Sequence, residues 1–159
     1  MLKIVLFLSR AIQKGWLKVL DHGGFIMYLA MLSNEKRHLF LNLEIYLSRI
    51  DGDFSDDEKR IIDVHCIEMH IDNNNYEADM PLDDVFQKLK ETLTHSERRI
   101  VFLELAATIM ADDVYHKEEE KITRKLSDLL EINDNEVKEA FSIIKDMKDV
   151  YKRCSDYIE

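Results

Sequence analysis

A short acidic segment occurs twice in this chain, each time between an apolar stretch and an amphipathic one. The first copy spans residues 50–61 and the second spans residues 111–122. Positions with equivalent side chains in the two copies are Asp51 and Asp112, Phe54 and Tyr115, Glu58 and Glu119, and Ile61 and Ile122. Because the flanking stretches have helical spacing, the duplication predicts a fold organised around two helix–loop–helix units.

The first acidic segment contains the residues that end one helix and begin the next. Gly52 tolerates the left-handed conformation that commonly terminates a helix, and Phe54 can fill the corner that follows. Ser55 and Glu58 form a capping-box pattern, in which each side chain satisfies a free amide at the next helix N-terminus. The helix dipole also favours acidic residues there. Helix capping alone therefore accounts for the acidic residues of this segment.

Turn-forming residues are scarce in the chain, which has one proline and four glycines among 159 residues. A many-stranded β fold would need more of them, so the scarcity favours helices joined by short turns. Thr94 and Glu97 form a second capping-box pattern, which opens the next helix. The part of that helix at residues 100–110 is apolar nearly all round, which is typical of a helix in the middle of a bundle. Apolar spacing predicts helices at residues 33–50, 55–69, 83–93, 94–110, 117–131 and from 133 onward.

Residues 2–20 form an amphipathic stretch with four basic and no acidic residues, followed by a pair of glycines. We assign residues 1–30 to a basic amphipathic helix with its glycine-containing connector, and residues 31–159 to the helical domain. Such a helix can lie on a membrane or dock on an acidic partner, but packing on the body of its own chain is the favoured interpretation. Met27 and Met31 are alternative start positions.

The formal net charge of −10 argues against non-specific nucleic-acid binding, which depends on basic residues that neutralise phosphates. It also confines any membrane contact to the N-terminal helix. An acidic surface suits cations, basic partners or solubility alone. Cys66 and Cys154 lie far apart without a CxxC pattern, so we interpret them as reduced thiols. Because the apolar N-terminus lacks a signal-peptide cleavage pattern, the sequence predicts a cytoplasmic protein.

The aligned carboxylates are the candidate site. If the two units pack face to face, Asp51, Glu58, Asp112 and Glu119 converge and could bind a hard cation or a basic partner. The first loop matches the second half of an EF-hand loop, but Leu47 and Arg49 occupy positions that should be acidic in its first half. A standard EF-hand is therefore not expected, and capping remains the simpler explanation of each acid taken singly.

Other chemistry-bearing residues do not assemble into a recognisable active site. Glu104 lies in the most apolar helix, where it is either a further ligand or the partner of Arg98 or Arg99. Cys66 and His70 have the spacing of two zinc ligands, but no second pair completes the set. Glycine-rich phosphate loops, a GxSxG elbow and an HExxH motif are all missing. The sequence therefore predicts a non-enzymatic protein with neither catalytic nor cofactor-binding residues.

Both acidic segments resemble the motifs of a known family, the tellurite-resistance TerB-like domains. The second motif is matched by residues 103–119, and the likeness as a whole covers roughly residues 31–150. The chain departs from the family pattern at Asp113, where glycine is usual, and at His116, where a capping hydroxyl is usual. The first motif reads Leu47-Ser48-Arg49-Ile50-Asp51-Gly52-Asp53-Phe54-Ser55-Asp56-Asp57-Glu58-Lys59.

The resemblance implies an all-α bundle of about seven helices in which two helix–loop–helix repeats face each other. It also implies a role in stress and tellurite resistance and a divalent-metal site at the aligned acids. Two functions stay open. One is a metal-responsive stress module that takes a divalent cation, with no other cofactor expected. The alternative is a scaffold that presents an acidic face to a protein partner or to a second copy of itself, without metal.

Overall fold

The computed structural model describes residues 28–49, 54, 56–72, 75–109 and 117–158. The described residues contain helices and no strand, which confirms the predicted all-α class, and the helix bounds agree closely with those expected from the apolar spacing. The helices are η2 (Tyr28–Met31, a 3-10 turn), α2 (Asn34–Ser48), α3 (Asp56–Met69), α4 (Leu82–Thr92), α5 (His95–Ile109), α6 (Lys117–Leu130) and α7 (Asp134–Ile158).

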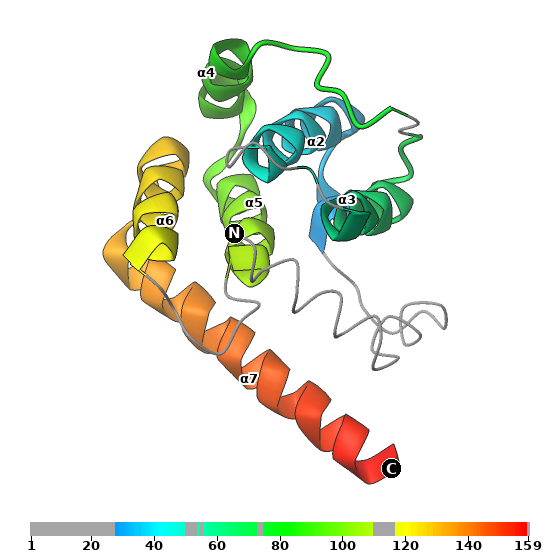
Figure 1. Cartoon of the computed structure of the whole chain (residues 1–159). Coiled ribbons are helices and arrows are strands. Elements are labelled where there is room, and N and C mark those ends of the chain that lie inside the picture. Colours follow the sequence, from blue (N-terminus) through cyan, green and yellow to red (C-terminus); the bar gives the residue numbers. More distant parts are fainter. Residues whose placement is uncertain (1–27, 50–53, 55, 73–74, 110–116, 159) are drawn as a thin grey trace.

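Helix α5 lies in the middle of the bundle, as its nearly uniform apolar sequence predicts (Figure 1). It contacts η2, α6 and α7, while α2 packs against α3 and α4. Each element buries its apolar face toward a single core. The largest fully buried side chains of that core include Phe40, Leu43, Ile62, Met69, Val85, Leu89, Phe102 and Leu130.

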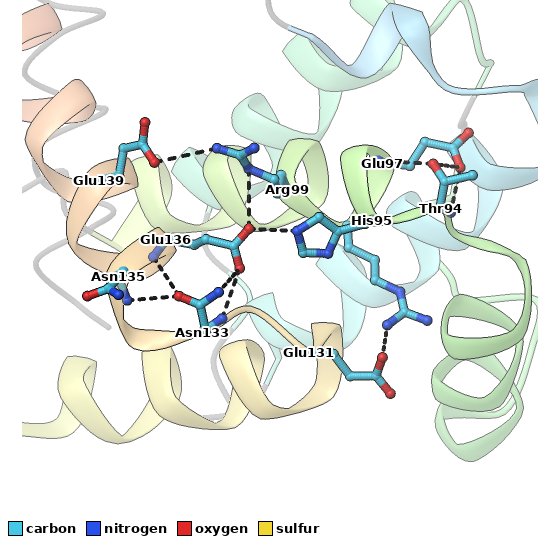
Figure 2. A network of polar contacts seen from close by, with 10 residues as sticks. Thr94, His95, Glu97, Arg99, Glu131, Asn133, Asn135, Glu136 and Glu139 are labelled. Carbon is cyan, nitrogen blue, oxygen red and sulfur yellow. Dashed lines mark hydrogen bonds and ion pairs between the residues drawn. The ribbon is translucent and has the colours of Figure 1, made fainter.

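Capping side chains fix where α5 and α7 begin (Figure 2). The predicted capping box of α5 is confirmed, because the backbone N–H of Thr94 donates to Glu97 Oε2 at 2.8 Å and the N–H of Glu97 donates back to Thr94 Oγ1 at 3.4 Å. At α7, Asn133 Oδ1 accepts the N–H of Glu136 at 3.1 Å, and Glu136 Oε2 accepts the N–H of Asn133 at 3.1 Å. Both helices therefore start with a reciprocal capping box.

The same residues join the two helix N-termini to each other. Glu136 Oε1 lies 2.6 Å from His95 Nε2 and 3.6 Å from Arg99 Nε, and Glu139 lies 3.6 Å from Arg99 (Figure 2). Further along, Leu103 of α5 and Ile143 of α7 line the same small hollow. Helices α5 and α7 therefore run side by side in the same direction.

A buried asparagine holds part of the long connection between α3 and α4 against α2. Asn42 Nδ2 donates to Asp79 Oδ1 at 2.8 Å, and Asn42 Oδ1 accepts the backbone N–H groups of Asp79 at 2.9 Å and Met80 at 3.2 Å. Tyr46 adds a hydrogen bond from its hydroxyl to the Met80 carbonyl at 2.9 Å. The described part of this connection is thus fixed by side chains in place of regular secondary structure.

Several sequence-based expectations fall outside the described residues. The basic stretch at residues 2–20, its glycine pair and both loop centres, at residues 50–53 and 110–116, belong to this group. The packing of the N-terminal segment and the facing of the two repeats therefore remain predictions. None of the helices in the described ranges combines the length and the apolarity needed to cross a membrane.

Candidate functional site

The structure describes the side chain of one of the four predicted metal ligands. Glu58 lies in the first turn of α3 and is buried. Asp51 and Asp112 lie outside the described residues, and Glu119 belongs to α6 without a described side chain. Within the described ranges, no group of three or more histidine, cysteine or acidic side chains is arranged to hold a metal ion. Whether the four acids converge therefore stays a prediction.

The corner at the start of α3 is closed by Phe54, as its position in the repeat predicts. Its ring meets the ring of Tyr76 edge to face, with centroids 5.8 Å apart. The Arg49 guanidinium lies 4.8 Å from the Phe54 centroid and the Lys59 ammonium lies 5.6 Å from it. Because cations favour the faces of aromatic rings, this arrangement ties the end of α2 to the start of α3.

Four ionisable side chains meet between α2, α3 and α5, and together we call them the core acid cluster: Glu44 of α2, His65 and the half-buried Glu68 of α3, and Glu104 of α5. Glu44, His65 and Glu104 are each at most 5% exposed. Burial of that many ionisable groups is unusual, because each loses its hydration unless a partner replaces it. The cluster is therefore the strongest candidate for a functional site among the described residues.

His65 and Glu44 form the ion pair at the centre of the cluster. His65 Nδ1 donates to Glu44 Oε1 at 2.5 Å, and the imidazole also meets the Phe40 ring edge to face at 5.6 Å. Burial by itself would lower the pKa of His65, but the charge and the hydrogen bond of Glu44 overcome it, helped by Glu104 and Glu68, and raise this pKa to about 9. His65 therefore carries a proton at neutral pH. Among the described residues, no group donates a hydrogen bond to Glu44 Oε2.

The two other carboxylates of the cluster anchor the η2 turn. Glu104 Oε1 accepts the backbone N–H of Tyr28 at 3.0 Å, and Glu68 Oε1 accepts that of Ala30 at 3.2 Å. Burial raises the pKa of both carboxyl groups, against the opposing effects of these amides and of His65. The second oxygen of Glu68 is buried and receives no hydrogen bond from the part of the chain that the structure describes. The cluster thus concentrates negative charge around one imidazolium.

The structure changes the interpretation of Glu104 and supports that of Cys66 and His70. Arg99 pairs with two acids of α7 (Figure 2), and Arg98 pairs with Glu131. Neither arginine is therefore the partner that the sequence offered to Glu104. The charge of His65 acts on Glu104 instead. Cys66 is buried while His70 is exposed beyond the end of α3, as expected for a core cysteine and an edge histidine.

Sequence reasoning did not find the pairing of Glu44 with His65. A weak signal existed, because Glu44 stands among apolar neighbours in α2 and His65 among apolar neighbours in α3. Such residues require buried partners, but periodicity alone does not say which helices meet. Only the packing of α2 against α3 brings them together.

Comparison of the chain with protein-family models, curated proteins and solved structures finds no match. The TerB-like assignment therefore rests on the motif residues and remains a proposal. The structure defines the fold class and not the family: the chain is an all-helical bundle with ionisable groups buried in its core.

Proposed function

We propose that this chain is a non-enzymatic, TerB-like stress-response module that takes up a divalent cation through Asp51, Glu58, Asp112 and Glu119. The observation that carries the proposal is the burial of Glu58, which is 7% exposed in the first turn of α3. A carboxylate withdrawn from water at a helix corner is a suitable ligand for a hard cation, which prefers oxygen donors.

The core acid cluster supports the same proposal through its charge. His65 and Glu68 belong to the same helix as Glu58, and the pKa values of Glu68 and Glu104 are raised by burial. A divalent ion near these groups would stabilise their ionised forms, because bound cations are often the largest local charges in a protein site. Cation uptake would therefore be coupled to the protonation of the bundle core.

Titration with metal ions tests this function. Calcium, magnesium, manganese and zinc are added separately to metal-free protein, with calorimetry and thermal unfolding as the measurements. One ion is expected to give saturable heat and, at 100 times its dissociation constant, about 2.7 kcal/mol of added stability. The Asp51→Ala/Asp112→Ala variant is expected to lose both effects.

Asp56→Asn is the matched control, because Asp56 is an exposed acid of the same helix turn that pairs with Lys59 at 2.8 Å. Its cation affinity should equal that of the unmodified protein. The proposal is wrong if no ion gives saturable heat, or if the double alanine variant binds as tightly as the control.

A second candidate function is a scaffold for a basic partner, and one observation favours it. No lysine or arginine occurs between Arg60 and Lys88, whereas this stretch contributes five exposed acids. We call these residues the acidic face: Asp72, Glu77, Asp79, Asp83 and Asp84. Arg49 reaches into this stretch, where it donates to the Tyr76 carbonyl at 2.6 Å, but the acids outnumber it. An excess of one charge attracts and orients a partner of the opposite charge.

Charge reversal tests the scaffold with a synthetic lysine-rich peptide as the probe, followed by fluorescence anisotropy. Asp83→Lys/Asp84→Lys is expected to weaken binding by at least about tenfold, or 1.4 kcal/mol. Asp146→Lys/Asp149→Lys on α7 changes the net charge equally at two exposed sites away from this face. Equal losses in both variants would show that only net charge matters and would exclude the acidic face as a specific surface.

A further inference from the structure

Helix α7 carries a heptad pattern along its whole length. An apolar residue recurs at every seventh position, at Val137, Ile144, Tyr151 and Ile158. A second set lies three residues after each of the first three, at Ala140, Met147 and Cys154, so the spacing alternates between three and four residues. Positions spaced in this way form one seam, which packs against another helix. Ile143, Val150 and Tyr157 form a second apolar row beside it. The helix therefore has more apolar surface than a helix at the edge of a bundle needs.

Helix α5 covers only the first half of this seam. The two helices start together at the His95–Glu136 contact and run in the same direction, but α5 has 15 residues and α7 has 25. At 1.5 Å per residue, α7 continues for roughly 15 Å beyond the end of α5. Ala140 and Ile144 are accordingly buried, and the red end of α7 projects from the body (Figure 1).

The projecting end, residues 148–158, exposes its apolar side chains to solvent. Val150 is 51% exposed, Ile158 77% and Tyr157 90%. Together with Cys154 they line one hollow on the surface. Adjacent exposed side chains of this size mark interaction sites more often than scattered ones do.

We infer that the projecting end of α7 is the contact through which two copies of this chain associate, with the two α7 helices antiparallel. An antiparallel pair brings the same flank of each helix together, so that Val150 of one copy meets Tyr157 of the other. In a parallel pair, Val150 and Tyr157 would instead face Lys148 and Ser155 of the other copy. Antiparallel packing also places the two bodies at opposite ends of the pair.

The charge of this segment suits a second copy as the occupant. The chain as a whole has a formal net charge of −10, so contact between most of its surfaces is opposed by repulsion. Residues 148–158 instead carry three basic and two acidic side chains. Two such ends can approach each other without that repulsion while the acidic bodies stay apart.

Sedimentation equilibrium of the full chain, in a concentration series reaching about 0.5 mM, tests the inference. A reversible dimer is expected, and Val150→Glu should raise its dissociation constant by roughly 100-fold, because a charge would be buried at the interface. Ile67→Glu is the matched control, since Ile67 is an apolar side chain on α3 that is 76% exposed. The control should dimerise like the unmodified chain.

A monomer at every concentration overturns the inference, as does a dimer that Val150→Glu and Ile67→Glu weaken equally. The orientation has a separate test by mild oxidation. Antiparallel heptads place Cys154 next to position 151 of the other copy, so Tyr151→Cys should give a disulfide-linked dimer and Tyr151→Cys/Cys154→Ser should not. A linked dimer of the unmodified chain through Cys154 would show a parallel pair instead.

Discussion

Replacing Glu44 by alanine is expected to lower the free energy of unfolding by about 3–5 kcal/mol, because it leaves a buried charge without its partner. His65 is 3% exposed, and its protonated ring donates to Glu44 at 2.5 Å. Without this carboxylate the imidazole either stays buried without its ionic partner or reaches water, and the contribution of the ion pair to the folded state is lost in both cases. Urea unfolding at pH 7 measures the loss.

Two further variants make this result specific to the ion pair. Glu35→Ala removes an exposed glutamate of the same helix and should change stability by less than about 0.5 kcal/mol. Glu44→Leu/His65→Leu removes both charges and should recover much of the loss, since an apolar pair can replace a buried ion pair. A loss below about 1 kcal/mol in Glu44→Ala would contradict the assignment of this pair as a buried ion pair.

Raising the pH is expected to destabilise the protein in one step near pH 9 as His65 loses its proton. The pKa of His65 is raised from 6.5 to about 9 in the folded chain, mainly by the charge of Glu44 acting against burial. The associated stability is therefore fully present below pH 6.5 and is lost as the pH rises through 9. A shift of this size corresponds to about 3 kcal/mol.

Chemical denaturation between pH 6 and pH 10 measures this loss, and NMR titration of the His65 ring identifies the group. Glu44→Gln removes the anion but keeps the side-chain size, so it should move the His65 titration to lower pH. An unmodified protein whose His65 titrates near its ordinary value would contradict the assigned ion pair.

The helices could be predicted because their signals are local. Thr94 and Glu97 are three residues apart, and this spacing alone specified the capping box that begins α5. The apolar stripe of α2, with Leu39, Phe40 and Leu43, likewise specified its buried face. Such patterns depend on neighbours within one or two turns, which the order of residues already gives.

The core acid cluster could not be predicted, because its members are brought together by packing. Glu44 and His65 are 21 positions apart, and the contact of Tyr28 with Glu104 spans 76 positions. Reasoning from the sequence sought the site at the repeated acids and offered Glu104 an arginine partner that the structure places elsewhere. Which helix faces meet is a property of the whole core, so charge partners across it cannot be read from spacing.

The sequence by itself determined the helical class, the helix limits and the repetition of acidic segments, since capping and periodicity act over a few residues. Tertiary structure decided which of the charged side chains became buried and what they contact. It also decided that α5 ends before α7 does, which leaves the apolar end of α7 in solvent. Side chains become buried and find partners only when separate helices pack into one core, because that packing removes water from some helix faces and leaves it on others.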